Sequence, residues 1–533
     1  MRPEGRGEYD SLYFTYPQFE APAADAPRDT DAPVIIVGAG PVGMTAALTL
    51  AAEGVRCLLV EAKGTFNDGS RAICVSRSSY HILERIGAVA PFLREGLPWT
   101  MGRTLYRGQQ ILEFQMPDGS DDRFRPMYNL QQQYIEAFLW DAVAAQPLIE
   151  TRWQTRVTAV EDQDGGVAVT LSDPHGDYRV SAPWLLAADG ARSAIRGMRG
   201  LRLKGENYEG RYVIADVRMA HDYPTIRRAL FDPGCRPGGT VLIHRQPQDI
   251  WRIDYQLGDG ESAEEATRED VVRASVSAVL AEIGHTGDWE LEWWSVYSAN
   301  TLALDEYRDG RVFFIGDSAH IVPIFGVRGL NNGLADAQNI GWKLGRVVTG
   351  RAGEGLLDSY TPERRGATLD VFANAQKSTR FMTPPTAGWR LMRDAALSLA
   401  LTQDWAGQLA NPRQMTPYTY ADSPAVVAGA GGFGPAAALG AMLPDAAEGD
   451  GFLSECLGPG FTLLCFGPAL EVAHLDLTVL SLPCDGAAGK RLGAAKGAAL
   501  LIRPDLHIGA RWSAPTPQAV LAAIATILST KVA

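Results

Sequence analysis

Residues 34–43 read VIIVGAGPVG and decide the fold. They are followed by the helical pattern MTAALTLAAEG and then by CLLV at residues 57–60. A continuous β-branched run is typical of a strand that is buried on both faces of a parallel sheet. A strand, a glycine-rich turn, a helix and a second strand within about 30 residues predict a right-handed βαβ unit. We therefore expect an α/β fold built on a parallel sheet.

The turn after the first strand fits the pattern G-x-G-x-x-G, in which each glycine has its own task. Gly38 permits the tight turn, Gly40 lets a pyrophosphate approach the backbone, and Gly43 lets the helix pack against the strand. Glu61 ends the second strand, where a carboxylate accepts hydrogen bonds from an adenosine ribose. This context predicts a dinucleotide site. The same letters recur at residues 429–434, but no strand and acid follow them, so we expect only a glycine-rich turn there.

Two later buried strands also end in an aspartate beside a glycine. In the first, Asp189 can position sugar hydroxyls or cap the next helix, and Arg196 can contact a phosphate. A plain Asp-Gly turn is the alternative. In the second, Asp317 follows the strand VFFI, and a long helical pattern begins near residue 330. The free N–H groups of that helix would suit an anionic ring edge such as that of a reduced flavin.

Composition excludes several classes of function. The 49 Lys and Arg residues against 62 Asp and Glu residues give a net charge of −13, which disfavours nucleic acid and anionic membranes as partners. The six cysteines are neither in C-x-x-C spacing nor grouped with histidine, so we expect no metal site and no disulfide framework. The amino terminus lacks the apolar core of a secretory signal, which predicts a cytoplasmic protein.

Changes of pattern along the chain predict several domains. Pro, Ala and acidic residues dominate the first 31 residues, alternating strands dominate the middle, and helical patterns return at residues 330–348 and 363–409. We expect a poorly ordered leader at 1–31, a nucleotide-binding domain in two parts at 32–205 and 301–422, an inserted, mainly antiparallel β-sheet domain at 206–300, a linker at 423–450 and a C-terminal domain at 451–533.

Three of these motifs together resemble the signatures of single-component FAD-dependent aromatic hydroxylases, the class of para-hydroxybenzoate, phenol and 3-hydroxyphenylpropionate hydroxylases. They are the turn at Gly38, the strand end at Asp189, and GDSAHIVPIFGVRGLNNGLADAQNIGWKL at residues 316–344. The resemblance implies a Rossmann-like FAD-binding domain of the para-hydroxybenzoate hydroxylase fold with an inserted substrate domain. The tail is similar to the thioredoxin-like domain of such enzymes, but it lacks C-x-x-C, so we expect a structural role there.

The resemblance also implies the cofactor and its residues. FAD would be bound, NADH or NADPH and O2 would be co-substrates, and no second nucleotide domain is expected. The matching cofactor positions are Gly38, Gly40, Gly43, Glu61, Arg71, Gln132, Asp189, Asp317, Pro323, Gly326, Arg328, Gly329, Leu330 and Asn331, and the candidates for contact with NAD(P)H are Arg192 and Arg196. Val327 departs from the usual glycine in the flavin loop, where it adds bulk facing the ring.

In this family a flavin C4a-hydroperoxide delivers oxygen to a phenolic ring, and the inserted sheet covers the flavin. The candidates for substrate contact on that sheet are His244, Arg252, Asp254 and Tyr255. Because side chains on a strand alternate, these four cannot all face the pocket. An exposed sheet arginine and a hydrogen-bonded or surface histidine are the alternative readings of Arg252 and His244.

Other chemistries and assemblies stay open at this point. The same fold also hosts enzymes that act on polyketide or polycyclic substrates by hydroxylation, epoxidation or Baeyer–Villiger oxygen insertion. A flavin-binding protein without turnover is a further alternative. A homodimer follows only from the resemblance, because charge is spread evenly along the chain.

Overall fold

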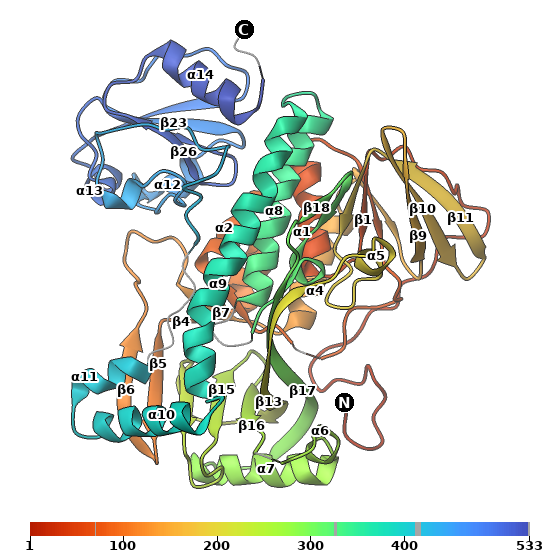
Figure 1. Ribbon diagram of the computed structural model, residues 1–533, viewed down its shortest axis with the longest axis vertical. Helices are drawn as coiled ribbons and strands as arrows, with labels where there is room; N and C mark the ends of the chain where they lie inside the picture. The colour runs from red at the N-terminus through yellow and green to blue at the C-terminus, as the bar shows by residue number, and fades with distance from the viewer. Residues whose placement is uncertain (70, 259, 324–327, 411–416, 531–533) are drawn as a thin grey trace.

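A parallel sheet forms the centre of the nucleotide-binding part (Figure 1). The computed structural model describes residues 1–69, 71–258, 260–323, 328–410 and 417–530. The strand order is β18-β19-β12-β1-β2-β8, and all neighbours are parallel except β18 and β19. The strands are Arg308–Asp309 (β18), Val312–Phe314 (β19), Trp184–Ala187 (β12), Val34–Val37 (β1), Cys57–Val60 (β2) and Ile149–Arg152 (β8). The predicted βαβ unit is confirmed by β1, α1 (Pro41–Ala52) and β2.

The helix α8 (Gly329–Val348) packs closely along α1. Glycines make this approach possible: a Cβ atom at Gly341 would lie 2.7 Å from the Thr49 side chain, and one at Gly345 would lie 2.5 Å from Glu53. A separate antiparallel sheet lies beside the parallel one and consists of Arg156–Gln163 (β9), Gly166–Asp173 (β10) and Gly176–Ala182 (β11). The expected long helix near residue 330 is therefore α8, and it packs along the helix that follows the glycine turn.

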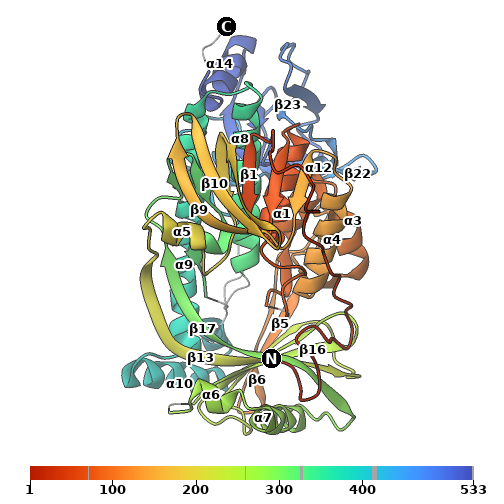
Figure 2. The same ribbon diagram turned by 90° about the vertical axis from the view of Figure 1, so that its right-hand side faces the viewer.

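The inserted domain is an eight-stranded sheet in the order β20-β17-β13-β16-β15-β14-β5-β6. Figure 2 shows the long strands β13 and β17 running from the first part of the molecule into this sheet. The strands are His320–Ile321 (β20), Trp289–Ala303 (β17), Lys204–Met219 (β13), Ile250–Gln256 (β16), Thr240–Arg245 (β15), Arg227–Phe231 (β14), Met101–Tyr106 (β5) and Gln109–Gln115 (β6). The predicted domain at 206–300 thus lacks three strands of this sheet: β5 and β6 come from far earlier in the chain, where β5 pairs in parallel with β14, and β20 comes from later in the chain and pairs with β17.

Helix α7 (Glu269–Glu282) covers one face of this sheet with Val272 and Val276, which pack against Trp251 and Trp294. The other face points toward the nucleotide-binding part. On that side Trp293 donates a hydrogen bond to Asp68 at 3.1 Å. The sheet therefore separates a closed apolar layer from a face that meets the nucleotide-binding part.

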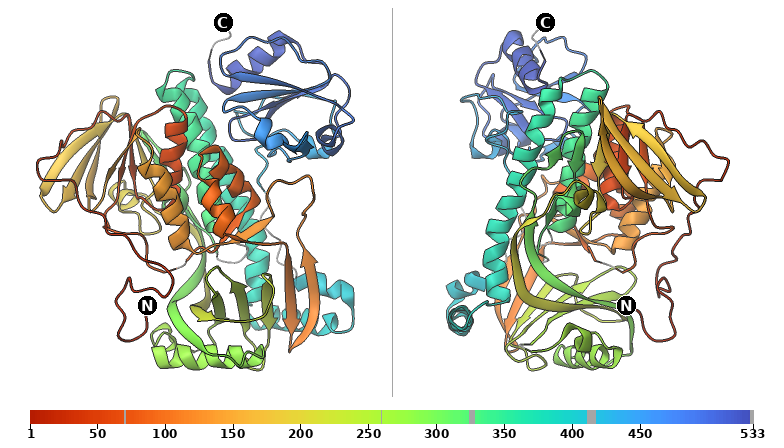
Figure 3. Two further views of the ribbon diagram at one scale, coloured as in Figure 1. Left: turned by 180° about the vertical axis from the view of Figure 1, so that it is seen from behind. Right: turned by 45° about the vertical axis from the view of Figure 1, so that its right-hand side comes forward.

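One long helix, α9 (Tyr360–Met382), connects three parts of the molecule. It begins beside α8, and at its other end Met382 packs with Phe231 of the inserted sheet. Helix α10 (Ala387–Ala400) then lies against β6, as Figure 3 shows. Of the helices within the described ranges, none has the length and apolar character needed to cross a membrane.

The leader, residues 1–31, is packed onto the molecule although it contains no helix or long strand. Arg2 forms an ion pair with Asp68 at 2.8 Å, and the Phe19 ring stacks on Trp153 with 4.0 Å between centroids. The prediction of a poorly ordered leader is therefore wrong. Its Pro- and Ala-rich average concealed a few aromatic and basic side chains that find partners on the folded surface.

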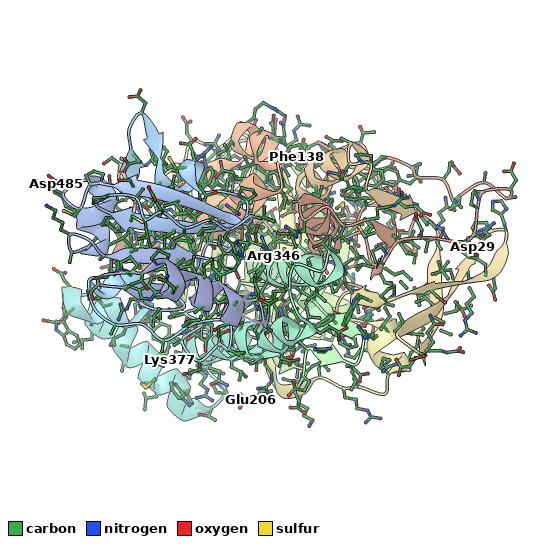
Figure 4. All side chains as sticks on the ribbon, turned by 90° about the horizontal axis from the view of Figure 1, so that it is seen from above. Asp29, Phe138, Glu206, Arg346, Lys377 and Asp485 are labelled. Carbon is green, nitrogen blue, oxygen red and sulfur yellow. The ribbon has the colours of Figure 1, made fainter. Side chains whose placement is uncertain are left out.

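The C-terminal sheet has the order β24-β23-β25-β26, with β24 parallel and β25 antiparallel to β23. Its elements are Phe461–Phe466 (β23), Leu477–Leu482 (β24), Ala487–Leu492 (α13), Ala499–Ile502 (β25), Ile508–Trp512 (β26) and Pro517–Ile527 (α14). Its assignment as thioredoxin-like stays a prediction. Asp485 in this unit and Asp29 in the leader lie at opposite ends of the molecule in Figure 4.

The second glycine motif, residues 429–434, packs against the C-terminal sheet. A Cβ atom at Gly429 would lie 2.2 Å from the Arg511 carbonyl oxygen, and one at Gly432 would lie 2.8 Å from Ala498. The glycines therefore allow close contact between two stretches of backbone. This agrees with the expectation that the motif is a structural turn.

A fully buried network of charges joins this unit to α8 and α9. Glu363 accepts hydrogen bonds from Lys343 at 2.7 Å and from both terminal nitrogens of Arg503 at 2.6 and 2.9 Å. Arg503 also pairs with Asp505 at 2.5 Å. Burial alone would raise the pKa of Glu363, but Arg503 and Lys343 outweigh it and hold that pKa far below its usual value. Two cations and two anions therefore balance inside the interface.

We expect Arg503→Met to destabilise the protein by about 3–5 kcal/mol, because it would leave Glu363 and Asp505 buried with too little positive charge. Urea unfolding followed by tryptophan fluorescence measures this, since Trp342 donates a hydrogen bond to Asp505. The control is Arg179→Met, which breaks an exposed pair with Glu161 and should change little. Equal unfolding midpoints for the two variants would contradict the assigned role of the network.

Candidate active site

The glycine turn between β1 and α1 leaves room for a ligand at one position only among its three glycines. Gly38 has φ +107°, and a Cβ atom there would lie 2.4 Å from the Ala188 carbonyl oxygen. A Cβ atom at Gly43 would lie 1.9 Å from the Gly38 carbonyl oxygen, whereas one at Gly40 would meet nothing within 4 Å. Gly38 and Gly43 therefore shape the turn. Gly40 opens the backbone at the start of α1, where free N–H groups favour a phosphate.

Glu61 stands at the end of β2 and braces this turn. Its carboxylate accepts hydrogen bonds from the backbone N–H of Ala39 at 2.8 Å and of Lys63 at 2.9 Å. An acid at this position thus holds the turn in shape. Its expected contact with a ribose stays a prediction.

A second loop carries Arg71 and is fixed by Gln132 at the start of α4 (Gln132–Ala144). The Gln132 side chain accepts from the Ala72 N–H at 3.1 Å and donates to Glu136 at 2.7 Å. Glu136 is buried, which raises its pKa. The Arg71 side chain is exposed, and its carbonyl oxygen accepts a hydrogen bond from Arg252 at 3.1 Å. Gln132 therefore positions the loop more than it presents itself to a ligand.

The strand end at Asp189 meets the one at Asp317. Asp189 accepts from the Ile195 N–H at 3.1 Å and so caps the short helix α5 (Ala194–Met198). Arg196 donates to the Ser318 carbonyl oxygen at 2.9 Å, which ties the two strand ends together. Arg192 is exposed. Of the two predicted contacts for NAD(P)H, Arg196 is thus engaged within the protein.

The turn that carries Asp317 is held in place by hydrogen bonds to Asp336 of α8. The Asp336 carboxylate accepts from the Gly316 N–H at 3.0 Å, contacts the His320 ring at 2.7 Å and pairs with Arg364 at 2.6 Å. The Asp317 side chain itself is accessible, although surrounding protein raises its pKa by desolvation. This combination is expected of a carboxylate on the wall of a recess that a bound molecule could fill.

The start of α8 lies beside the same turn. Asn331 accepts from the Ser76 N–H at 2.8 Å and donates to the Cys74 carbonyl oxygen at 3.1 Å, so its side chain attaches α8 to β3 (Cys74–Ser76). Among the other predicted cofactor residues of this segment, Pro323 and Arg328 are buried, Gly329 and Leu330 are half-buried, and Gly326 lies outside the described residues.

A row of polar side chains crosses the sheet face that points toward this turn. His244 of β15 stands opposite Arg252 of β16, which stands opposite Asp216 of β13. Arg252 and Asp216 form a buried double hydrogen bond at 2.9 and 3.1 Å. The register that pairs Arg228 with Ile243 places Arg227 beside His244 on the same face. The row therefore contains two groups, Arg227 and Asp216, that the sequence did not single out.

Asp254 and Tyr255 lie on opposite faces. Asp254 shares the face of Arg252, and burial raises its pKa to about 7. Tyr255 packs in the apolar layer with Val272 and Val276 of α7. The structure therefore brings together three of the four predicted substrate contacts and corrects the fourth, because the alternation of side chains turns Tyr255 away.

Arg227 carries no sequence signal that separates it from Arg228 next to it. Charged residues on strands are usually exposed. Only the pairing register of β14 reveals which of the two arginines is directed toward the nucleotide-binding part.

Comparison with known proteins places the chain among flavin-binding proteins. The family described as "FAD binding domain" matches residues 31–375. A 3-(3-hydroxy-phenyl)propionate/3-hydroxycinnamic acid hydroxylase from Mycobacterium sp. (strain JLS) is 30% identical over 370 residues, which are 69% of this chain and 63% of that protein. The protein of the same name from Klebsiella pneumoniae (strain 342) is 30% identical over 365 residues, 68% of this chain and 64% of that protein. The matched region thus spans less than two thirds of these relatives.

Solved structures share the fold over nearly the whole chain. The flavin-dependent monooxygenase PieE, in complex with FAD and substrate, aligns with a TM-score of 0.77 and 24% identity over 95% of this chain and 100% of that one. Aklavinone-11 hydroxylase, in a ternary complex with FAD and aklavinone, aligns with a TM-score of 0.74 and 21% identity over 94% of this chain and 100% of that one.

The geometry of Gly40 generates a direct test of the cofactor site. Gly40 has an ordinary φ of −73° and free space beside it, so Gly40→Ala should leave the stability of the cofactor-free protein unchanged. The added methyl group should nevertheless weaken FAD binding by about tenfold or more, because it occupies the space where the diphosphate would approach. Titration of the cofactor-free protein with FAD, followed by flavin fluorescence, measures the affinity.

The control is Gly388→Ala in α10, where a Cβ atom also fits without a clash. This variant should bind FAD as the unchanged protein does. An unchanged FAD affinity in Gly40→Ala would show that the diphosphate does not pass over Gly40.

Proposed function

Because the chain belongs to the FAD binding domain family, we propose that it is an NAD(P)H- and O2-dependent monooxygenase that hydroxylates a phenolic aromatic substrate. One observation carries this proposal. A buried row of polar side chains lies on the sheet face that points toward the cofactor loops; it consists of His244, Arg252 and Asp216, with Asp254 beside it. Arg252 donates a hydrogen bond directly to the loop of Arg71. A polar site thus lies where the two parts of the molecule meet.

The residues of this chain fit FAD. The open backbone at Gly40 and the start of α1 would hold the diphosphate, and the accessible carboxylate of Asp317 would hold the ribityl chain. The backbone from Arg328 to Asn331 would border the ring system, since a helix N-terminus favours negative charge there. Bound FAD would supply electron transfer from NAD(P)H and the activation of O2.

The protein itself would position the cofactor loop, exclude water from the site and supply a base. Asp216 neutralises Arg252, so that this arginine can hold the Arg71 loop without an uncompensated charge. Asp254 is buried and has no hydrogen-bond partner on Oδ1 within the described residues. With a pKa of about 7 it can take the proton of a phenol at neutral pH and make the ring electron-rich. Burial of the site would also keep water from the reacting oxygen.

This base favours phenol hydroxylation over the other chemistries of the fold. Epoxidation and Baeyer–Villiger insertion do not need a phenol to lose its proton. A flavin-binding protein without turnover would have no use for an ionisable group at this position. The relatives named as hydroxylases support the same choice.

Absorbance spectra and turnover assays test the proposal. The purified protein should show a flavin spectrum, and its oxidation of NADH or NADPH in air should accelerate with a phenolic compound. The product should be about 16 mass units heavier, as expected for one inserted oxygen. Bound FAD without stimulation by any phenol would refute the hydroxylase assignment, and failure to bind FAD would refute the cofactor assignment.

Asp254→Asn should lower kcat for hydroxylation by about 100-fold or more, because asparagine cannot accept the phenol proton. In the unchanged protein hydroxylation should rise as the pH increases through about 7, since Asp254 acts only after it has lost its own proton. Product formation measured from pH 5.5 to 8.5 reports both effects. The exposed Asp222→Asn is the control and should keep the full pH profile. A pH profile in Asp254→Asn that matches the unchanged protein would exclude Asp254 as the base.

A further inference from the structure

We propose that residues 2–19 of the leader form a strap that holds the loop of Arg71 against the inserted sheet, and that Arg2 is the positioning residue of this strap. Figure 2 shows the leader reaching from the nucleotide-binding part to the inserted sheet. The family match begins at residue 31, so the strap lies outside the matched region. The consequence for catalysis rests on the proposed function, because the Arg71 loop would border the bound cofactor.

Arg2 is buried between two carboxylates that belong to different parts of the molecule. Its side chain is 3% exposed and pairs with Asp68 of the Arg71 loop at 2.8 Å and with Glu292 of β17. Burial would lower the pKa of Arg2, but Glu292 and Asp68 outweigh it and raise that pKa. One guanidinium therefore joins the loop to the inserted sheet, and its charge allows the two carboxylates to lie close together.

An irregularity in β17 places Glu292 at this contact. The pairing register of β13 and β17 shifts between Asp216 and Val217, opposite the stretch of β17 that contains Glu292. An extra residue of this kind redirects a side chain away from the regular alternation. The buried Glu292 carboxylate also accepts hydrogen bonds from the Ser11 hydroxyl at 2.6 Å and from the Leu12 N–H at 2.9 Å. The sheet thus offers one buried carboxylate that binds several residues of the leader.

The Arg71 loop has further contacts with the inserted sheet. Trp293 donates a hydrogen bond to Asp68 at 3.1 Å, and a Cβ atom at Gly69 would lie 2.0 Å from the Trp293 ring. Arg252 donates to the Arg71 carbonyl oxygen at 3.1 Å. Within the described residues, Asp68 forms its ion pair with Arg2. Arg2 is therefore the group that compensates the charge of this loop where it meets the sheet.

The other end of the strap is attached to the nucleotide-binding part. The Tyr16 hydroxyl accepts hydrogen bonds from Arg2 at 3.3 Å and from Gln133 of α4 at 2.9 Å. The Phe19 N–H donates to the Gly64 carbonyl oxygen at 2.7 Å, shortly before the Arg71 loop begins. The strap is thus bound on both sides of the junction between the two parts.

The strap also affects the charge beside the polar row. Burial raises the pKa of Asp216, and Arg252 opposes this change; Glu292 adds to it, and Arg2 opposes it. Loss of Arg2 would therefore leave the charge of Glu292 uncompensated near the pair of Asp216 and Arg252. That pair is the one that holds the Arg71 carbonyl.

A loop held on the sheet keeps water out of the space between the two parts, which the proposed oxygen insertion requires. A detached loop would admit water to that space. The two electrons of NAD(P)H would then reduce O2 to H2O2, and no oxygen would enter the aromatic ring. The strap is therefore expected to govern how much of the NAD(P)H consumed yields hydroxylated product.

Amide hydrogen exchange, measured by mass spectrometry with and without FAD, tests the position of the loop without requiring turnover. The N–H groups of Asn67 and Ala72 donate to side chains of α4 at 2.8 and 3.1 Å, so their exchange reports opening of the loop. Arg2→Met should accelerate this exchange by about tenfold or more, because Asp68 and Glu292 would repel each other. Exchange in the C-terminal sheet should not change.

The yield of product per NAD(P)H oxidised is the second measurement. Arg2→Met should lower this yield by about half or more while NAD(P)H oxidation continues, since the missing fraction appears as H2O2. Arg2→Lys keeps the charge and should retain most of the yield. The control is Arg28→Met, which removes the ion pair of another leader arginine with Asp173 of β10 and should change neither exchange of the loop nor yield.

Asp68→Asn tests whether Arg2 acts through the loop. Asparagine can still accept the hydrogen bond of Trp293 but has no charge to pair with Arg2. This variant keeps the pair of Arg2 and Glu292, so it should fold and still show accelerated exchange of the loop. The double variant Arg2→Met/Asp68→Asn should lose no more yield than Arg2→Met alone. Additive losses would contradict an action of Arg2 on Asp68.

Two results would overturn the inference. One is exchange of the loop in Arg2→Met and Asp68→Asn at the rate of the unchanged protein. The other is acceleration by the same factor in the C-terminal sheet, which would indicate a general loss of stability. Exchange of the loop that responds to Arg2 in a protein that hydroxylates no phenol would refute the proposed function alone. Unaltered exchange in a protein that hydroxylates a phenol would refute this inference alone.

Discussion

The buried carboxylate of Asp336 is the contact on which the arrangement of the site depends. It receives the Gly316 N–H, the His320 ring and the Arg364 guanidinium, which come from a strand end, the following strand and α9. Burial alone would raise the pKa of Asp336, but Arg364 and His320 outweigh it and keep the carboxylate ionised. One charge on α8 therefore sets the position of the Asp317 turn and of the helix that leads to the C-terminal unit.

Two further sets of buried ionic contacts join the nucleotide-binding part to the rest of the molecule. Toward the inserted sheet, Arg252 bridges Asp216 and the carbonyl of Arg71, so that a strand of one part fixes a loop of the other. Toward the C-terminal unit, Glu363 collects Lys343 and Arg503. In each case the ionic groups are buried and satisfied, which makes the relative placement of the parts specific.

The sequence predicted the features that depend on local pattern. The run at residues 34–43, its three glycines and Glu61 are adjacent in the chain, and their spacing alone specifies a strand, a turn and a helix. Features that depend on long-range pairing were not predictable. The strands β5 and β6 join the inserted sheet across more than a hundred residues, and the aromatic contacts of the leader form only on the completed surface.

The polar row on the sheet also combines features that local pattern predicted with features that only the folded structure revealed. The alternation of side chains predicted that the candidates could not all face one way, and it separated Asp254 from Tyr255. Which face is which followed only from the packing of α7. Arg227 was missed because neither its type nor its neighbours distinguish a buried strand arginine from an exposed one. The predicted cofactor residues, in contrast, lie on several strand ends and loops: Arg196 joins the Asp189 strand end to Ser318, and Asp336 holds the turn of Asp317, while Gly326 lies outside the described residues.

Helix α9 has a consequence for how such a chain can vary. Its first turns carry Glu363 and Arg364 into the charged contacts, and its last turn carries Met382 into an apolar cluster with Phe231, on the face of the inserted sheet opposite α7. Each residue added to an α-helix rotates everything beyond it by about 100°. A single insertion or deletion between these contacts would turn one end out of alignment, whereas many substitutions on the outer surface would not. We therefore expect the number of residues between Arg364 and Met382 to be constrained, and insertions or deletions to be tolerated only in the loops that flank α9.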